Sequence, residues 1–276
     1  MVALLCRVAT ITWALVPIGQ AEPEKPSAQT SAPSPTPTEP AAQPQAKPNV
    51  EPLGNGKFKV GSIEFDSKFR EIRVPAKVNM HGAVGESPLE YLLVRTHGKV
   101  HESLFTTASP ALEINLAFTL LSYPPSAELY ALPNDTGGLS GNFPDVPEPV
   151  KRAARIRIDV ESTQGGSTKR VPVGDWIRHT SKLSAMPLTP WVYGGSEFYE
   201  GTYVPESTGD IVAIFTARAA MINFTGDDRK EDTSWQVFPD RVPPIGTPVT
   251  LVFAPFFPSE TSPKTSPEPS PSTKTP

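Results

Sequence analysis

The sequence predicts an α+β domain in which mostly antiparallel short strands and hairpins pack on one buried helix, between disordered proline-rich N- and C-terminal arms. Three observations support this class. Several short segments alternate apolar and polar residues with a period of two, which is typical of half-buried strands. Residues 109–122 carry apolar side chains almost all round a helix, which predicts burial. Residues 22–52 and 258–276 are rich in proline and lack aromatic residues, as disordered chains do.

Residues 1–21 have the pattern of a secretory signal peptide. The segment is mostly apolar, carries Arg7 near its start, and ends in small residues that fit cleavage after Ala21. A membrane anchor is the alternative, but the apolar run at residues 8–18 is shorter than the roughly 20 residues that span a bilayer. We therefore expect an exported protein (in the periplasm, at the cell surface or secreted) with no membrane span in the mature chain.

Cysteine content and charge exclude several classes of function. The only cysteine, Cys6, lies inside the predicted signal peptide, so we expect no disulfide, thiolate nucleophile or cysteine metal ligand in the mature chain. The formal net charge is −4 and no basic block stands out, so nucleic acid is not an expected partner. No phosphate loop, dinucleotide fingerprint or zinc motif occurs, and we expect no cofactor.

Composition divides the rest of the chain into three parts. Residues 22–55 are predicted to be a disordered linker, residues 56–257 a single folded domain, and residues 258–276 a disordered tail rich in Pro, Ser and Thr. The arms suit spacers or proline-motif ligands, and equally suit low-complexity tails under little constraint. A split into two subdomains near residues 123–150 stays open, because that stretch is rich in turn-forming residues.

Alternation and apolar runs place most strands. Residues 70–79 and 154–162 alternate cleanly, and residues 168–173 follow as the hairpin partner of the second segment. Residues 209–216 form an apolar run typical of a buried strand, and residues 247–256 read as the last strand. Short helices are expected at residues 174–182 and 217–224.

The segment at residues 97–105, HGKVHESLF, holds two of the four histidines. Its first two residues suit a tight turn, which predicts a hairpin between residues 89–96 and 99–105. On that strand His97 and His101 stand about 13 Å apart, too far to share a zinc ion whose ligands lie about 2 Å away. We therefore expect no metal site here.

His101 and Ser103 are the candidate catalytic residues, as general base and nucleophile of a hydrolase. The predicted hairpin places them on one strand face about 7 Å apart, too far for a direct hydrogen bond. Glu102 is expected on the opposite face, where it pairs with Arg95 across the hairpin and cannot assist His101. The alternative is that all of these residues are structural.

Residues 109–122 are predicted to form the one clear helix. Ser109 is the candidate N-cap and Pro110 suits the first helical position. The prolines at residues 124–125 end the helix. We expect it to pack across a sheet as a core element.

Trp191 and Tyr193 are the candidate binding residues. If exposed, they would form a stacking platform for a sugar or a protein partner, and if buried they would be ordinary core. The acidic residues at 227–232 could bind calcium, but their spacing is not that of an EF-hand loop, and a solvated charged loop is the alternative.

Several segments together resemble proteins that carry a YdjY-type domain. These are FKVGSIEFDSKFREIRVPAKVNM, GKVHESLF, PALEINLAFTLLS, PWVYGGSEF and GTPVTLVFAP, in the order in which the family has them. The resemblance implies an exported bacterial domain of unsettled biochemical activity. Some relatives are described as ferredoxin-like, but a mature chain without cysteine cannot hold a four-cysteine iron–sulfur cluster, so electron transfer is not carried over. The family's His-Glu-Ser segment matches residues 101–103.

The function expected from the sequence is a non-enzymatic binding or structural module of the bacterial envelope, with an unknown envelope ligand or protein as partner. The first alternative is an envelope hydrolase with His101 as its base. The second is a metal-dependent protein that combines His101 with acidic residues from distant loops.

Overall fold

The structure, a computed structural model, describes residues 49–257, which fall within a single compact unit. The predicted signal peptide, the predicted linker up to residue 48 and the predicted tail lie outside the described residues. Strand β1 (Val50–Gly54) lies in the segment expected to be linker, so secondary structure begins before residue 56.

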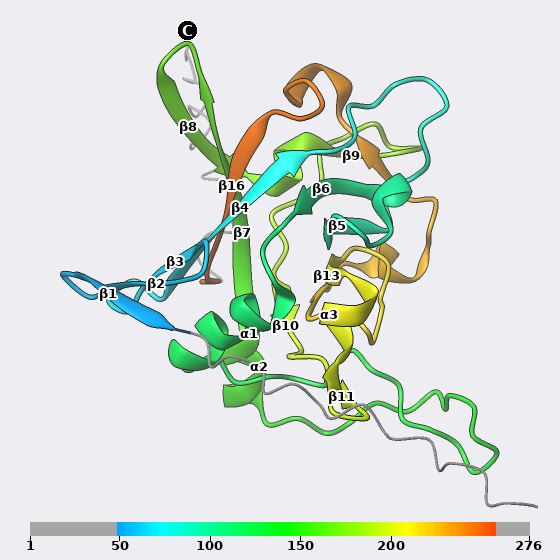
Figure 1. Cartoon of the computed structure of the whole chain (residues 1–276). Helices are drawn as coiled ribbons and strands as arrows, with labels where there is room; N and C mark the ends of the chain where they lie inside the picture. Colours follow the sequence, from blue (N-terminus) through cyan, green and yellow to red (C-terminus); the bar gives the residue numbers. More distant parts are fainter. Residues whose placement is uncertain (1–48, 258–276) are drawn as a thin grey trace, which may run out of the picture. The chain divides into compact units, whose positions relative to one another are not determined.

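Eight strands close into a barrel (Figure 1). In spatial order they are β4 (Glu71–Val78), β16 (Pro248–Pro255), β7 (Arg155–Gln164), β10 (Trp191–Tyr193), β14 (Ile222–Phe224), β13 (Asp210–Ala213), β5 (Tyr91–Arg95) and β6 (Ser103–Thr107). The ring closes where β6 pairs back onto β4, with Thr106 opposite Lys77. Most neighbours are antiparallel, whereas β5–β6 and β13–β14 are parallel.

The predicted α+β class is wrong. Among the described residues 37% lie in strands and 17% in helices. Because successive strand residues point to opposite faces, apolar side chains such as Ile72, Ile158 and Leu251 fill the barrel interior, where they are buried. The strands therefore pack round a core of their own instead of packing on one helix.

The other elements of the described part lie outside this ring. They are β2 (Lys57–Val60), β3 (Ile63–Asp66), β8 (Ser167–Pro172), β9 (Ile177–His179), β11 (Phe198–Tyr199), β12 (Thr202–Tyr203), β15 (Trp235–Val237), the helices α1 (Ala111–Leu120), α2 (Glu148–Ala154) and α3 (Val204–Thr208), and the 3-10 helices η1 (Val100–Glu102), η2 (Val173–Trp176), η3 (Asp227–Lys230) and η4 (Pro239–Arg241). The meander β1–β2–β3 extends from β4, and β8 forms a projecting hairpin with β7 (Figure 1).

Helix α1 confirms the predicted helix, and its buried side chains belong to the main core, but the strands do not pack on this helix alone. Phe118 stacks on Tyr193 of β10, with ring centroids 4.6 Å apart, and meets Phe253 of β16 edge to face. The helix thus packs beside the barrel, at its lower end in Figure 1. The N-cap residue is Pro110, and the predicted cap Ser109 instead shares a 2.7 Å hydrogen bond with Ser62.

Strands β4, β7, β13 and β16 lie where the sequence predicted strands, and the β7–β8 hairpin is confirmed. The predictions of two short helices, at residues 174–182 and 217–224, are wrong. Residues 217–224 contain β14, and residues 174–182 contain η2 and β9. A short apolar run does not distinguish strand from helix, and here the parallel pairing of β14 with β13 decides.

The predicted hairpin across residues 97–98 is also wrong. β5 and β6 run parallel, with Tyr91 opposite Ser103. Parallel neighbours need a crossover, and η1 supplies part of it. The side chain of Asn79, just beyond β4, donates hydrogen bonds to the carbonyls of Val100 (2.5 Å) and Ser103 (2.8 Å) and so holds η1 in place.

Strand β4 exchanges one neighbour for another along its length. It pairs with β3 as far as Arg73 and with β6 from Lys77 onward. Pro75, which has no N–H to donate, stands between these two regions, and its carbonyl accepts a 2.7 Å hydrogen bond from Thr107 Oγ1. The divergence of β3 and β6 leaves space on the outer face of the barrel, and a cleft lies there.

Candidate functional site

The candidate base His101 lies on η1 at the surface. Its side chain is 72% exposed, and its Nε2 lies 3.4 Å from Glu102 Oε2. The expectation that Glu102 faces away from His101 is therefore wrong, because η1 replaces the strand on which it depended. Arg95 does not pair with Glu102 as expected but forms its ion pair with Glu206.

The candidate nucleophile Ser103 is fully buried at the start of β6. Its hydroxyl donates a 2.9 Å hydrogen bond to the carbonyl of Phe105. The exposed imidazole of His101 and this buried hydroxyl are not brought together, so the pair does not form a base and a nucleophile.

A polar cluster of Lys99, Tyr91 and Asp210, which the sequence reasoning missed, lies next to η1. Lys99 Nζ donates a 2.5 Å hydrogen bond to the hydroxyl of Tyr91 and lies 3.6 Å from Asp210 Oδ2. The Tyr91 hydroxyl also reaches Asp210 Oδ2, at 3.5 Å. Burial raises the pKa of the Asp210 carboxyl and of the Tyr91 phenol. The signal available in the sequence was Asp210 at the start of an apolar strand, a costly place for a carboxylate.

Trp191 and Tyr193, the candidate binding residues, are both 3% exposed. The indole of Trp191 packs on Phe224, and the hydroxyl of Tyr193 donates a 2.7 Å hydrogen bond to Asn115 Oδ1. Neither ring forms a stacking platform at the surface. Their neighbourhood is the barrel core and the contact with α1.

Within residues 49–257 no three His, Cys, Asp or Glu side chains gather into a group that could hold a metal ion. The acidic residues at 227–232 therefore form no calcium cage in this part of the chain, and η3 occupies residues 227–230. No helix of the described residues is long and apolar enough to span a membrane.

His179, which the sequence reasoning passed over, lies beside a cavity of about 510 Å³. Its Nδ1 accepts hydrogen bonds from the backbone N–H groups of Ser181 (3.2 Å) and Lys182 (3.3 Å). Nε2 therefore carries the hydrogen and faces Asp228 Oδ2 at 3.5 Å. The Ser181 hydroxyl also lies 3.2 Å from Nδ1, but that nitrogen already caps a turn, so the group does not form a Ser-His-Asp triad.

An open cleft of about 910 Å³ lies on the outer face of the barrel. It lies over β4, β16, β7 and β8, where β3 and β6 diverge from β4. Its volume falls in the range of small-molecule sites. The hydroxyl side chains that line it are Ser62, Thr96, Thr106, Thr107, Ser109, Thr163, Thr168, Thr247 and Thr250. Arg73, Lys77 and Glu161 are its charged groups.

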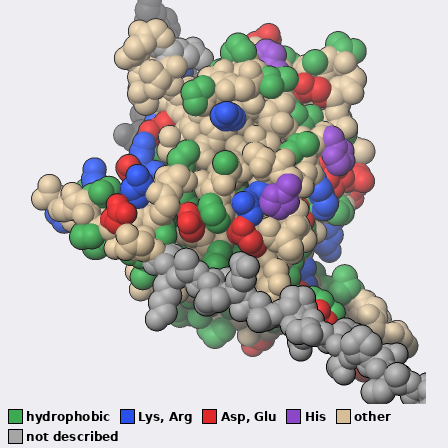
Figure 2. All heavy atoms as spheres, viewed as in Figure 1, with side chains coloured by type: hydrophobic (Ala, Val, Ile, Leu, Met, Phe, Trp, Pro, Cys, Tyr) green, Lys and Arg blue, Asp and Glu red, His purple; other side chains and the backbone are tan. Residues whose placement is uncertain are grey.

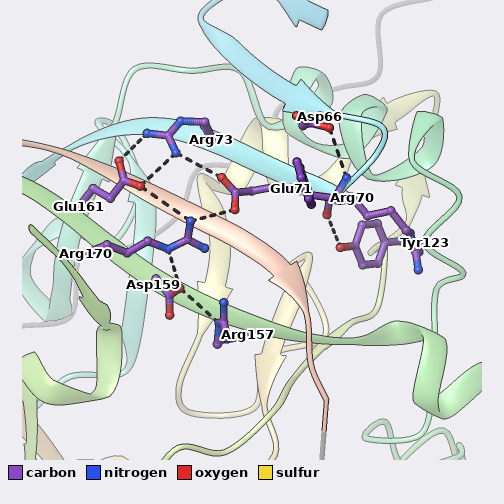
Figure 3. A network of polar contacts seen from close by, with 10 residues as sticks. Asp66, Arg70, Glu71, Arg73, Tyr123, Arg157, Asp159, Glu161 and Arg170 are labelled. Atoms are coloured by element: carbon purple, nitrogen blue, oxygen red, sulfur yellow. Dashed lines mark hydrogen bonds and ion pairs between the residues drawn. The ribbon is translucent and has the colours of Figure 1, made fainter. Parts of the chain in front are cut away.

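One end of this cleft is formed by an ion network (Figure 3). Arg73 on β4 reaches across β16 to Glu161 on β7, and Arg170 on β8 bonds to Glu71 and to Asp159 at 2.8 and 2.7 Å. On β16, Val252 stands opposite Arg73 and Thr250 opposite Glu161, so only short side chains lie between the two charged groups. The hydrogen bond from Arg73 lowers the pKa of Glu161 and raises that of Arg73.

The other end is formed by hydroxyl groups and by the cation of Lys77. Thr163 and Thr168 share a 2.9 Å hydrogen bond, which leaves the pair one hydrogen to donate. Lys77 stands opposite Thr106 on β6 and opposite Pro248 on β16. It forms no ion pair with any described residue. The cleft therefore offers an ammonium group together with several hydroxyl donors and acceptors.

Hydrophobic side chains on the face seen in Figure 2 are scattered in small groups between charged ones. The described side chains visible on that face thus form no large apolar patch.

Comparison with known proteins supplies a family for this fold. No curated protein matches the chain, and no solved structure matches it. A family model described as the YdjY domain matches residues 63–254, more than half of the 276 residues. The match includes β3, reaches Ala254 in β16, and so contains all the strands of the barrel. The chain therefore belongs to the YdjY domain family.

Proposed function

We propose that the barrel is a non-enzymatic binding module of the bacterial envelope, and that its cleft binds an anionic, hydroxyl-rich ligand such as a segment of an acidic glycan. The observation that carries the proposal is the row of side chains across the cleft. Lys77 lies between Thr106 on β6 and Pro248 on β16, and the hydroxyl pair of Thr163 and Thr168 lines the same cleft. Lys77 has no carboxylate partner among the described residues. The envelope location rests on the signal peptide that residues 1–21 predict.

Binding is favoured over catalysis by the state of the charged groups in the cleft. A general acid at neutral pH needs a carboxyl with a raised pKa, whereas Arg73 lowers the pKa of Glu161. The hydroxyl of Thr107 already donates a hydrogen bond to the carbonyl of Pro75, and the hydroxyl of Ser109 is already hydrogen-bonded to that of Ser62. These groups suit recognition, in which several polar contacts act together, better than activation of one nucleophile.

The chemistry of the lining points to the class of ligand. An ammonium group attracts a carboxylate or phosphate, and threonine side chains offer both hydroxyl groups and methyl groups to a sugar ring. The charges of Arg73, Lys77 and Glu161 sum to one net positive charge. A neutral sugar would leave Lys77 without a counter-charge, so an acidic saccharide should bind more tightly.

Calorimetry with the full chain tests this function. A short oligogalacturonate should bind, and a neutral oligosaccharide of the same length should bind more weakly. Lys77→Met should weaken binding of the acidic sugar by about tenfold, the effect of about 1.4 kcal/mol. The matched control is Lys57→Met, because Lys57 is exposed on β2 and does not line the cleft.

The proposal is contradicted if neither sugar binds, or if both lysine variants bind the acidic sugar equally well. The alternative of a hydrolase at His101 is less favoured, because the hydroxyl of Ser103 is buried and bonded to Phe105.

A further inference from the structure

The cluster of Lys99, Tyr91 and Asp210 lies away from the cleft, and neither the family nor the proposed binding function accounts for it. Asp210 is 2% exposed and Tyr91 is also 2% exposed. Tyr91 also belongs to a small apolar cluster, separate from the main core, that it forms with Val94, Ala213 and Ala220 and with the partly buried Val100 and Ala217. A lysine and a carboxyl group thus meet at the edge of an apolar environment.

We propose that Lys99 and Asp210 become joined by an intramolecular amide bond, which the folded domain forms without an added reagent. The amide would link the crossover between β5 and β6 to the first residue of β13, two segments far apart in the sequence.

The hydrogen bonds run in the direction that the reaction requires. Lys99 Nζ donates to the Tyr91 hydroxyl at 2.5 Å, and that hydroxyl donates to Asp210 Oδ2 at 3.5 Å. Nζ itself lies 3.6 Å from Oδ2. The phenol can therefore accept a proton from the attacking nitrogen and pass its own proton to the departing oxygen.

The step balances without an oxidant or a cofactor. A proton first moves from the Lys99 ammonium to the Asp210 carboxylate, which gives a neutral amine and a carboxylic acid. The amine nitrogen attacks Asp210 Cγ and the C–N bond forms. The C–Oδ2 bond then breaks, and Oδ2 leaves as water with the acid hydrogen and with one amine hydrogen relayed by Tyr91.

Burial favours the neutral product. Asp210 Oδ1 has no hydrogen-bond partner in the described part of the chain, and an unpaired carboxylate oxygen is costlier to bury than an amide carbonyl. Burial also raises the pKa of Asp210, toward the acid form that an amine can attack. For Lys99 burial acts to lower the pKa, but the Tyr91 hydrogen bond and the Asp210 charge outweigh it, and the pKa is raised on balance. The ion pair is thus the starting form, and the reaction is slow and occurs once per molecule.

Two glycines hold the reacting segments at this distance. Gly209 has φ +82°, and a Cβ placed on it would lie 2.7 Å from Gly98 Cα. The N–H of Arg95 donates a 2.8 Å hydrogen bond to the Gly209 carbonyl. The neighbours of these glycines, Lys99 and Asp210, are therefore held together by backbone contacts as well as by their charges.

Mass spectrometry of the full chain tests the bond. Trypsin cannot cut after an amidated lysine, so the expected product is one branched species of residues 96–151 and 183–218, lighter than the two peptides together by one water. Residues 96–99 and 100–151 as separate, unmodified peptides from protein that is folded by circular dichroism would overturn the proposal.

Variants distinguish amide formation from a simple ion pair between Lys99 and Asp210. Asp210→Asn should still form the amide but lose ammonia in place of water, and Tyr91→Phe should form it more slowly. Lys99→Met should form none and lower Tm by roughly 5–15 °C, as loss of a cross-link over a long loop predicts. Lys77→Met is the control and should keep the branched species. If wild type and Asp210→Asn both stay unlinked after prolonged incubation, the cluster is only an ion pair.

Discussion

Thr107 Oγ1 donates a 2.7 Å hydrogen bond to the carbonyl of Pro75, at the point where β4 leaves β3 and joins β6. A proline within a sheet lacks one ladder hydrogen bond and is tolerated where the strand has no neighbour on that side. Here that position coincides with the hollow from which the cleft extends. The same contact therefore stabilises the division of the sheet and shapes the proposed binding site.

Thr107→Val should lower the free energy of unfolding by about 1–2 kcal/mol. It keeps the side-chain shape, but it leaves the Pro75 carbonyl without this donor and the Ser109 N–H without the acceptor that lies 3.0 Å away. Urea unfolding at neutral pH measures the change. Thr106→Val is the control, since Thr106 is partly exposed and its hydroxyl makes no hydrogen bond within the described chain. Equal effects of the two substitutions would show that the Pro75 contact carries no special weight.

The second prediction concerns the stability of the protein at acidic pH and follows from the pKa of Glu161. Arg73 lowers this pKa from the ordinary value of 4.5 through its hydrogen bond. The unfolded chain then binds the proton more readily, so the stabilisation is fully present above pH 4.5 and is lost as the pH falls through the lowered folded value. Glu161→Gln should therefore cost about 1 kcal/mol at neutral pH and progressively less as the pH falls below 4.5.

Urea unfolding of both proteins across this pH range measures that difference. Glu200→Gln controls for removal of an exposed carboxylate, because Glu200 lies at the exposed turn of the β11–β12 hairpin. A cost for Glu161→Gln that stays constant from neutral pH to pH 3 would contradict the coupling to Arg73.

Local sequence patterns were sufficient to predict where the longer strands lie, but not how the strands assemble into a barrel. The alternation of Ile72, Val74 and Ala76 correctly marked the inward face of β4. Nothing local distinguishes a strand that packs on a helix from one that curves into a barrel, because the inward face is apolar in both. Closure depends on the pairing of Lys77 with Thr106, a contact that period-two patterns do not contain.

The prediction of His101 and Ser103 as a catalytic pair was wrong for a related physical reason. The turn at His97-Gly98 suited a hairpin, but Asn79, distant in sequence, fixes the next residues as a 3-10 helix. Because this connection differs from the predicted hairpin, His101 lies at the surface and Ser103 lies in the core. The cleft and the Lys99 cluster each combine residues from several distant segments, and no motif joins those segments in the sequence.

The packing of α1 gives a third prediction. Phe118 is fully buried between Tyr193 and Phe253, whereas Leu120 on the same helix is 47% exposed. Phe118→Ala should therefore lower the free energy of unfolding by about 3–5 kcal/mol, because it leaves a cavity. Leu120→Ala, which shares the helix, should cost less than about 1 kcal/mol. Similar costs for both, measured by urea unfolding, would mean that α1 is held only by its own helical contacts.

The close approach of Gly209 to Gly98 gives the fourth prediction. An alanine at residue 209 meets two costs: the positive φ of +82° and the contact of its Cβ with Gly98 Cα at 2.7 Å. Gly201 separates these costs, because it has φ +79° and no atom of the described residues lies within 4 Å of the added Cβ. Gly201→Ala should therefore cost about 1 kcal/mol from the backbone alone. Gly209→Ala should cost roughly 2–4 kcal/mol, because the backbone there must also move.

Thermal and urea unfolding of the two glycine variants measure the comparison. In Gly209→Ala the crossover must shift away from β13, so Lys99 Nζ should also move away from Asp210, and histidine NMR signals should change at His97, next to Gly98, but not at the distant His179. If both variants lose the same stability, strain at positive φ explains both, and residues 98 and 209 are not held in contact. A larger loss at residue 209 alone shows that the contact between the two glycine backbones, and not turn geometry, positions the lysine against the carboxyl group.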